Sequence, residues 1–585
     1  MPKNKEQIPT AMWTSALLIA SQSFLFGFVF SCLNACLVTG DNNNGSDCYN
    51  GSDSTCPKGT MYNDINLSTF EAQLATSLTI LGAWIGSLLG SGPSQQYGKR
   101  MTLLGNNTFF VVGAALSSIG NYYTLFIGRF ISGLGVGIAS GIPSVLLSEI
   151  ATAETRGTIT TIHQVMVTTG IFISGILGYG LVTYVEHGWQ LIQAFAAIPA
   201  IGMILLQNYV PESPKWLLMQ SNMALRPDTI NKLHSMEQQQ AGNGGGNATT
   251  PQYDSMTSTT STQQGIVAAV KEHEMYSAVV KTLQPLRRPG HSIDQEIADT
   301  LADAKKEAVS QVDGADVTWG EVFSYRKGMV IGLGLMTYQA LTGVNTVIFY
   351  STTIFGLAGF SESIIGTSCV GLVNLCVTVL CSYLIDTMGR KILLLAGTYV
   401  MLFALVLLST ILVCPIDEGV QGMIAVLAVL IFIAGFALGL GAVVWTVMSE
   451  IMPTRLRVKA ISLFLSVNWG SNLIIGLLTL TAIDELGGVE SSMDDDEEAD
   501  AQKLGVAYMY FLFSAITVTC LIFMHTLVPE TKDKTLEEIM GVSDSDSSAS
   551  GSAAGAVRVP LLSATAAAAG AVVEEGADDS EHGGR

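Results

Sequence analysis

The feature that most constrains this chain is a series of long apolar segments separated by short polar breaks. A helix needs about 20 predominantly apolar residues to cross the hydrocarbon core of a bilayer. Because backbone polar groups in lipid must be satisfied within the segment, each window of this length predicts a helix. The fold class is therefore an all-α membrane protein with twelve transmembrane helices, expected at 12–38, 70–91, 101–119, 124–146, 159–183, 189–209, 329–357, 364–386, 392–414, 421–448, 460–482 and 505–527.

The composition agrees with this class. The mean hydropathy is +0.43, and only 13% of the 585 residues are charged, which is too few for an ordinary soluble domain. The net charge of −20 comes largely from solvated loops and the end of the chain, as in the run 493–498. The chain shows no nucleophile–base constellation, metal-ligand cluster or phosphate-binding loop. We therefore expect no enzyme, no metal, no cofactor and no nucleic-acid partner, but contacts with membrane lipids and a small solute.

A long polar region divides the apolar segments six and six. It includes a run at 238–264 that is too rich in Gly, Asn, Ser, Thr and Gln to pack a core. The predicted organisation is a cytoplasmic lead (1–11), a first six-helix bundle (12–210) with a large extracellular loop (39–67), a partly disordered cytoplasmic linker (211–328), a second six-helix bundle (329–528) and an acidic, mostly disordered tail (529–585).

The basic residues predict the orientation, because Lys and Arg accumulate on the cytoplasmic side of membrane proteins. With the N-terminus inside, only Lys58, Arg129 and Lys503 fall at the outer face, which favours cytoplasmic termini. Cys48 and Cys56 share the first outer loop and are candidates for a disulfide. The same loop holds three sequons, whose candidate glycosylation sites are Asn44, Asn50 and Asn66.

The stretch 337–351 carries two amides inside a predicted membrane helix. Gln339 and Asn345 lie six residues apart and are separated by a helix-weakening Thr342-Gly343. A neutral amide in hydrocarbon is costly unless it meets a partner. Such side chains either face a water-filled cavity, where they would suit a neutral polyol, or bridge neighbouring helices. These residues alone leave both interpretations open.

Three motifs recur in the same order in each half. They are Gly98-Lys99-Arg100 with Gly389-Arg390-Lys391, Ser148-Glu149 and Arg156 with Ser449-Glu450 and Arg457, and Pro211-Glu212-Ser213 with Pro529-Glu530-Thr531. Parallel repeats place a binding site at the midplane between two halves that rock against each other. We hypothesise that charged motif residues pair at the cytoplasmic face only when it is closed, so that Glu450→Gln would favour inward opening. The predicted gate residues are Arg100, Glu149, Arg156, Asp386, Arg390, Glu450 and Arg457.

On these motifs the chain resembles the sugar porters of the major facilitator superfamily, over nearly all of 12–540. The motifs are GRFISGLGVG, SEIATAETRG, PESPKWL, QALTGVN with FYS, IDTMGRK, SEIMPTRLR and VPETK. The large first loop with its cysteine pair is similar to that of hexose transporters from protists such as kinetoplastids. The resemblance implies that amides and indoles bind sugar hydroxyls and the pyranose face. By position in the motifs these are Gln164, Gln339, Asn345, Asn374, Trp445, Trp469 and Asn472, with Asn468 beside them.

The sequence departs from the family pattern where specificity and coupling are decided. Ala340 replaces the second of two paired glutamines, and Ala442 and Val444 replace prolines, so we expect a weaker bend in the tenth segment. Val29 stands where proton-coupled relatives carry an aspartate. No Asp or Glu lies at the middle of a predicted helix, which favours uniport. His163 is the one candidate that could couple transport to protons.

The resemblance thus implies facilitative transport of monosaccharides, glucose and related hexoses, by alternating access across the plasma membrane. Two alternatives stay open. One is a proton-coupled hexose or myo-inositol symporter, which a proton uncoupler would inhibit. The other is a sugar sensor that binds but scarcely transports, which would show no counterflow in liposomes.

Overall fold

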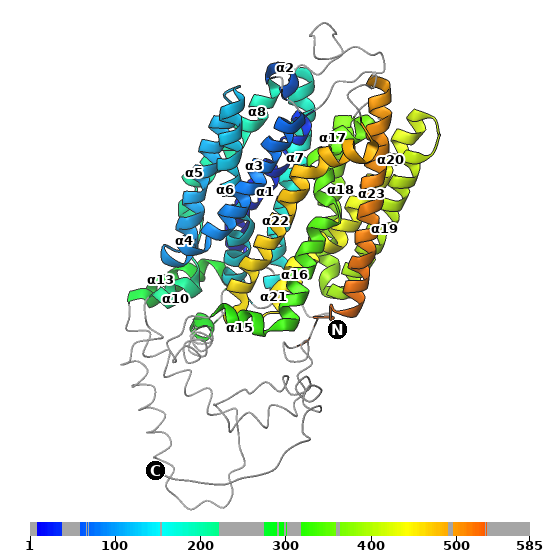
Figure 1. Cartoon of the computed structure of the whole chain (residues 1–585). Coiled ribbons are helices and arrows are strands. Elements are labelled where there is room, and N and C mark those ends of the chain that lie inside the picture. The colour runs from blue at the N-terminus through cyan, green and yellow to red at the C-terminus, as the bar shows by residue number, and fades with distance from the viewer. Residues whose placement is uncertain are drawn as a thin grey trace, which may run out of the picture. The chain divides into compact units, whose positions relative to one another are not determined.

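The structure is a computed structural model that describes residues 9–37, 59–65, 67, 69–152, 155–220, 274–288, 292–297, 300, 318–358, 363–489, 495–532 and 534. Every regular element in these ranges is helical, and the long helices lie side by side (Figure 1). Several predictions fall outside these ranges and stay predictions: the Cys48–Cys56 disulfide, the sequons at Asn44, Asn50 and Asn66, the 238–264 run and most of the 529–585 tail.

The first half is built from six membrane segments and shorter helices between them. In chain order these are α1 (Thr10–Ser31) with η1 (Asn34–Cys36), α2 (Met61–Ile65), α3 (Thr69–Leu89), α4 (Ser91–Gln96), α5 (Lys99–Ser117), α6 (Tyr122–Ile150), α7 (Arg156–Tyr184), α8 (Gly188–Phe195), α9 (Ala197–Leu205) and η3 (Gln207–Tyr209). The second half holds α16 (Arg326–Leu341), α17 (Val344–Leu357), α18 (Ser363–Met388), α19 (Arg390–Val413), α20 (Glu418–Phe436), η5 (Ala437–Gly441), α21 (Val443–Glu450), α22 (Thr454–Gly487) and α23 (Asp495–Thr526).

Eleven helical segments in the described ranges are long and apolar enough to cross a membrane. The twelfth long helix, α5, is more polar because Asn106 and Asn107 lie in its interior. Both amides are buried and bond to Gln22 of α1: Asn106 Nδ2 donates to Gln22 Oε1 (2.8 Å), and Gln22 Nε2 donates to Asn107 Oδ1 (2.6 Å). Since α5 packs against α6 and α9, it is part of the same bundle. The predicted twelve-helix membrane fold is confirmed.

Glycines let α3 and α6 approach closely. A Cβ at Gly133 would lie 2.3 Å from the Thr79 carbonyl oxygen, and one at Gly137 would lie 2.1 Å from that of Ala83. Either side chain would therefore push the two backbones apart. This agrees with small residues being the packing surface between helices in lipid.

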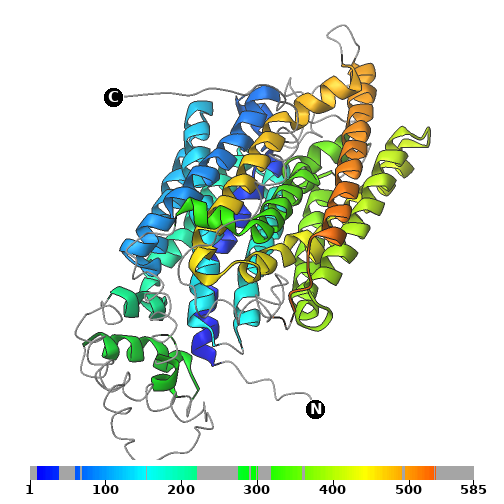
Figure 2. The same ribbon diagram turned by 60° about the horizontal axis from the view of Figure 1, so that its bottom comes forward.

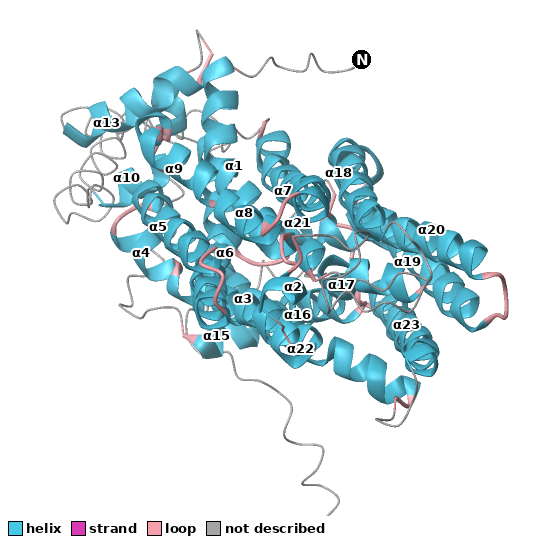
Figure 3. Ribbon diagram, turned by 90° about the horizontal axis from the view of Figure 1, so that it is seen from above, coloured by secondary structure: helices cyan, strands magenta, loops and turns pink. Residues whose placement is uncertain are grey.

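The two halves meet mainly along two pairs of helices, α7 with α18 and α3 with α22, and α17 also contacts α1 and η1. Viewed along the bundle, α5 and α9 lie on one side and α19, α20 and α23 on the other, with α7, α16, α17 and α22 between them (Figure 3). We call the end of the bundle that holds Gly98 and Gly389 the motif end, which is the lower end in Figure 1, and the opposite end, where η1 meets α17, the loop end.

The linker contributes helices at the motif end. These are α10 (Pro214–Gln220), α13 (Glu274–Leu283) with η4 (Gln284–Leu286), and α15 (Trp319–Ser324) (Figure 2). Leu286 packs into the core of the first half, beside Met12 and Ile150. The buried Arg287 donates from Nη1 to the Ile150 carbonyl (2.8 Å) at the C-terminus of α6 and binds Glu296 through Nε (2.7 Å). A cation at the negative end of a helix dipole is favourable, and it fixes this part of the linker to the first half.

Candidate solute-binding site

The predicted weak point at Thr342-Gly343 is a true break in the seventh membrane segment. Gly343 has φ 89°, a conformation that favours glycine, and it separates α16 from α17. A Cβ there would also lie 2.5 Å from the Phe513 ring. The break leaves Gln339 and Asn345, 7% and 6% exposed, on two separate helices inside the protein.

Four amides from α16, α17 and α22 form one continuous hydrogen-bonded chain. The Asn345 amide nitrogen donates to Asn472 Oδ1, and Asn472 Nδ2 donates to Asn468 Oδ1 (3.1 Å). Asn468 Nδ2 then donates to Gln339 Oε1 (3.0 Å), and Gln339 Nε2 donates to the Leu440 carbonyl (2.8 Å). We call these four side chains the amide chain. Each is buried, so the groups satisfy one another in this conformation.

The acceptor at the end of the amide chain exists because the tenth membrane segment is interrupted. Residues Ala437–Gly441 form a π-helical turn between α20 and α21. The wider turn leaves the Leu440 carbonyl available to Gln339 and the Leu438 carbonyl available to Cys381 Sγ (3.3 Å). A π-turn with glycines at 439 and 441 interrupts the helix here without prolines, and the expectation of a weaker bend stays a prediction.

Aromatic rings from the first half pack against the indole of Trp469, which neighbours Asn468 of the amide chain on α22. Trp469, on α22 between Asn468 and Asn472, lies 5.9 Å from both Phe26 and Phe30 of α1, measured between ring centroids. Its Nε1 is buried and has no hydrogen-bond partner in the described part of the chain. An unpaired indole N–H in a buried site is a donor available to an incoming oxygen.

The other predicted binding residues lie on three more helices. Asn374 is buried in α18, while Gln164 of α7 and Trp445 of α21 are half-buried. The structure records no side-chain hydrogen bond from these three residues to the amide chain. Direct hydrogen bonds thus join only the four members of the amide chain to one another. The assignment of Gln164, Asn374 and Trp445 to the same site stays a prediction.

At the loop end, the Asn34 side chain joins the two halves. Asn34 of η1 donates from Nδ2 to the Ile348 carbonyl (2.9 Å) and to Ser351 Oγ (2.8 Å) of α17. Its Oδ1 accepts from the Thr352 backbone N–H (3.3 Å) and from Thr352 Oγ1 (3.1 Å). One turn away, the Phe30 ring packs on Phe349 at 4.6 Å between centroids. Asn34 was not among the predicted site residues, and its sequence signal was limited to being an amide near the end of the first apolar segment.

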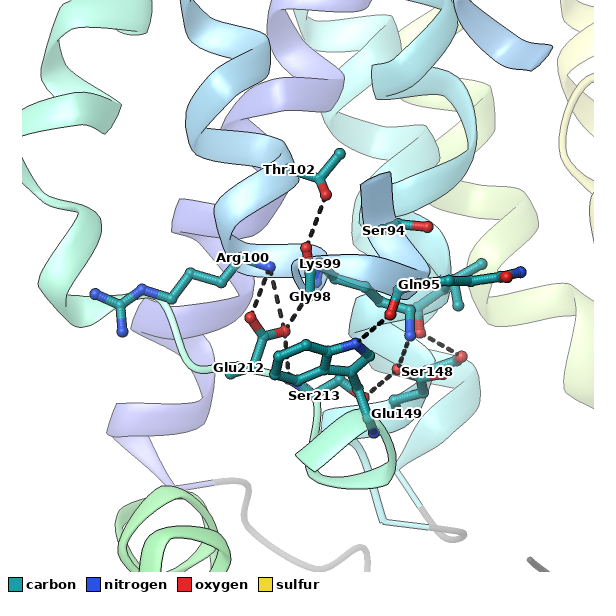
Figure 4. Close-up of polar contacts among 12 residues, drawn as sticks. Ser94, Gln95, Gly98, Lys99, Arg100, Thr102, Ser148, Glu149, Glu212 and Ser213 are labelled. Carbon is teal, nitrogen blue, oxygen red and sulfur yellow. Dashed lines mark hydrogen bonds and ion pairs between the residues drawn. The ribbon is translucent and has the colours of Figure 1, made fainter. Parts of the chain in front are cut away.

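At the motif end of the first half, a carboxylate caps a helix. Gly98 has φ 91° and turns the chain into α5. The Glu212 carboxylate accepts from the backbone N–H groups of Lys99 (3.0 Å) and Arg100 (3.2 Å), as Figure 4 shows. A negative charge at the positive end of the helix dipole stabilises this corner.

A second carboxylate, Glu149 at the end of α6, lies on the other side of the same corner. It pairs with Lys99 Nζ (2.8 Å) and accepts from Ser213 Oγ (2.5 Å) (Figure 4). The three repeated motifs therefore meet in one network: the Gly-Lys-Arg corner, the glutamate that ends α6, and the Pro-Glu-Ser segment.

The second half repeats this network. Gly389 has φ 93°, and the Glu530 carboxylate accepts from the Arg390 backbone N–H (2.9 Å). Glu450 pairs with Arg390 Nη2 (3.0 Å) and accepts from Thr531 Oγ1 (2.5 Å). The repeat predicted from the sequence is thus a structural repeat as well.

The environment of Glu530 favours its charged form. Burial raises the pKa of this carboxyl, but hydrogen bonds from the backbone N–H groups of Lys532, Arg390, Lys391 and Thr531 lower it more. The net pKa lies below its ordinary value of 4.5. The carboxylate therefore holds this corner in the ionised state at neutral pH.

The motif charges that the structure shows paired do not pair across the two halves. Glu149 pairs with Lys99 and Glu450 with Arg390, so each ion pair lies within one half. The physical reason is that the positive-φ glycine places the cation that follows it directly beside the glutamate of its own half. Glu450→Gln would therefore break a pair inside the second half, and its expected effect on inward opening stays a prediction.

The remaining predicted gate residues make other contacts. Arg100 Nη2 reaches Asn208 Oδ1 (3.4 Å), and Arg457 donates from Nε and Nη2 to the Met452 carbonyl (3.3 and 3.2 Å). The partner of Glu149, Lys99, was not among the predicted gate residues, although its position in the motif was the available signal. Two side chains lie outside the described part of the structure, those of Arg156 and Asp386.

Two groups bear on coupling to protons. The buried Arg129 of α6 donates from Nη1 to the Val29 carbonyl (3.0 Å) and to Cys32 Sγ (3.4 Å), and no carboxylate of the described residues contacts it. His163 of α7 is buried and lies with its Nδ1 2.7 Å from Ser23 Oγ. Neither group contacts the amide chain.

Two six-helix halves built on one repeated set of motifs define a transporter of the major facilitator superfamily. The architecture is similar to that of solved structures of XylE, the xylose transporter of E. coli. A double tryptophan variant of XylE superposes with a TM-score of 0.64 and 21% identity, covering 91% of this chain and 99% of that one. The chain belongs to the sugar (and other) transporter family, whose model matches residues 15–263 and 267–542.

Two curated relatives show the range of the family. Plastidic glucose transporter 4 of Arabidopsis thaliana is 26% identical over 466 residues, which cover 79% of this chain and 71% of that protein. The arabinose-proton symporter of Bacillus subtilis is 26% identical over 485 residues, covering 81% of this chain and 87% of that protein. The sugar-porter resemblance is confirmed, and the chain is a multi-pass membrane protein of a family of sugar transporters.

Proposed function

We propose that this protein is a facilitative carrier of hexoses, such as glucose, and that the amide chain holds the sugar hydroxyls. The observation that carries the proposal is the composition of the site: four linked carboxamides, an unpaired indole N–H and no carboxylate among the groups they contact. Carboxamides donate and accept at once, as a hydroxyl does. A sugar can therefore replace the bonds that these amides make to one another at little net cost.

The proposed transport mode is uniport. A proton-coupled carrier needs a titratable group that changes its charge during the cycle. Val29 has no titratable side chain, and its backbone carbonyl accepts a hydrogen bond from the Arg129 guanidinium. His163 is bonded to Ser23 inside the first half, away from the amide chain. Both arrangements support a carrier whose charge does not change.

The proposed orientation places the motif end in the cytoplasm, with the protein in the plasma membrane. Basic residues concentrate at this end, where Lys99, Arg100, Arg390 and Lys391 begin α5 and α19. In the described conformation Asn34 and Phe30 bind the halves together at the loop end, whereas the motif-end ion pairs stay within each half. We infer that this conformation is closed toward the outside.

Counterflow in vesicles tests the proposal. Purified protein should exchange radiolabelled glucose against unlabelled hexoses, and a proton uncoupler should leave the rate unchanged. Gln339→Ala and Asn345→Ala should each raise KM roughly tenfold, since each removes at least one hydrogen bond to substrate worth about 1.4 kcal/mol. Gln421→Leu is the matched control, because Gln421 is a buried amide that bonds to carbonyls at the end of α19.

Three results would contradict the proposal in different ways. Absence of hexose counterflow would reject the carrier and leave the sensor. Strong inhibition by the uncoupler would reject uniport and leave the proton symporter. An equal rise in KM for Gln421→Leu and Gln339→Ala would show that loss of a buried amide, rather than of a sugar contact, causes the change.

A further inference from the structure

The short helix α15 carries its aromatic side chains on the outside. Trp319 and Phe323, four residues apart and therefore on one face, are 49% and 52% exposed, with ring centroids 6.4 Å apart. Val322, which lies to one side of this face, is fully buried. The helix begins at Thr318, whose Oγ1 accepts from the Glu321 backbone N–H (3.3 Å). A capped helix thus presents two large aromatic rings away from the protein.

The position of α15 places these rings where a bilayer would end. The helix packs against α22 and the start of α16 at the motif end (Figures 1 and 2). The membrane-crossing parts of these two helices begin at Arg326 and Lys459. Tryptophan prefers the boundary between headgroups and acyl chains, because its ring is apolar and its N–H is polar.

The described residues around the rings are predominantly basic. The Lys459 ammonium lies 5.9 Å from the centre of the Trp319 ring, and Arg326 and Lys327 at the start of α16 are exposed. Glu321 is the acidic residue of α15. Among the described residues around the two rings, these three cations stand against one carboxylate, which gives this part of the surface a positive charge that complements the phosphate of an acidic lipid.

We propose that Trp319, Phe323, Arg326, Lys327 and Lys459 form a docking surface for acidic phospholipids of the leaflet at the motif end, which we call the α15 surface. The two rings enter the boundary between headgroups and acyl chains, and the cations bind the lipid phosphates. Because α15 leads directly into α16, the lipid fixes the start of the helix that carries Gln339. This inference does not depend on which solute the protein carries.

Tryptophan quenching tests the α15 surface without any transport measurement. The full-length protein is placed in phosphatidylcholine vesicles that contain brominated phosphatidylglycerol or, at equal mole fraction, brominated phosphatidylcholine, with bromine near the headgroup end of the acyl chains. The chain has seven tryptophans, so the Trp319 signal is the difference between the parent and Trp319→Phe, which keeps an aromatic ring. We expect this signal to be quenched more by the acidic lipid. Lys459→Gln should lower that preference by roughly two- to fivefold.

Trp216→Phe is the matched control at the same end of the molecule. The Trp216 indole is half-buried on α10 and donates from Nε1 to the Gln95 carbonyl (2.7 Å), so its difference signal should show no preference for the acidic lipid. Absence of quenching of the Trp319 signal would place α15 in water and overturn the proposal. Equal quenching by the two brominated lipids, or an acidic preference unchanged by Lys459→Gln, would overturn its electrostatic part and with it the choice of lipid.

Discussion

Asn34→Ala should release the closed loop end. The Asn34 side chain makes four hydrogen bonds to α17 of the other half, and it is 3% exposed. Each bond contributes about 0.5–1.5 kcal/mol net, so the four sum to roughly 2–6 kcal/mol. Water can solvate the freed groups once the halves separate, which favours the lower end of the range. A loss of about 2 kcal/mol moves the equilibrium between closed and open loop ends roughly 30-fold toward the open form.

Labelling of a gate residue measures this shift. Phe349 is 3% exposed in the closed loop end, so Phe349→Cys should react slowly with a membrane-impermeant maleimide added from outside. The labelling rate of the cysteine introduced at position 349 should rise roughly 30-fold when Asn34→Ala is also present, or reach the rate of a fully accessible cysteine. The control is Thr367→Val, which removes bonds to the same Ser351 (3.1 Å) and Thr352 (2.8 Å) hydroxyls from α18, within one half. An unchanged rate with Asn34→Ala, or an equal rise with Thr367→Val, would refute the reasoning.

Two further predictions concern charge. Because the pKa of Glu530 is lowered in the folded protein, its stabilising contribution is present above pH 4.5 and is lost as the pH falls below that value. Glu530→Gln should thus lower the melting temperature by roughly 2–4 °C at pH 7 and by less at pH 4, and a pH-independent difference in thermal-shift assays would contradict this. Val29→Asp places a carboxylate near Arg129, whose Nη1 lies 3.0 Å from the Val29 carbonyl. Uptake by this variant should become sensitive to a proton uncoupler, and uptake that stays insensitive would show that a carboxylate at this position is not enough for coupling.

The class of fold follows from the sequence alone. Segments of about 20 apolar residues cannot lie in water, and in lipid they must be helical, so the number and order of the membrane helices follow from composition along the chain. The repeat of Gly98-Lys99-Arg100 as Gly389-Arg390-Lys391 also predicted two equivalent halves. The break at Gly343 was visible because glycine is weak in helices and suits φ above zero.

The partners of individual side chains depend on how the helices pack together. Motif spacing placed Glu149 and Glu450 at the same end of the molecule, but it left open whether their cations come from the same half or from the other. Likewise, the four amides were each visible as costly groups in apolar helices. Their union in one chain depends on the π-turn that frees the Leu440 carbonyl and on how α16 packs against α22. Such contacts join residues up to 129 positions apart, and local sequence preferences act over a few residues only, so packing of the whole bundle was needed to select them.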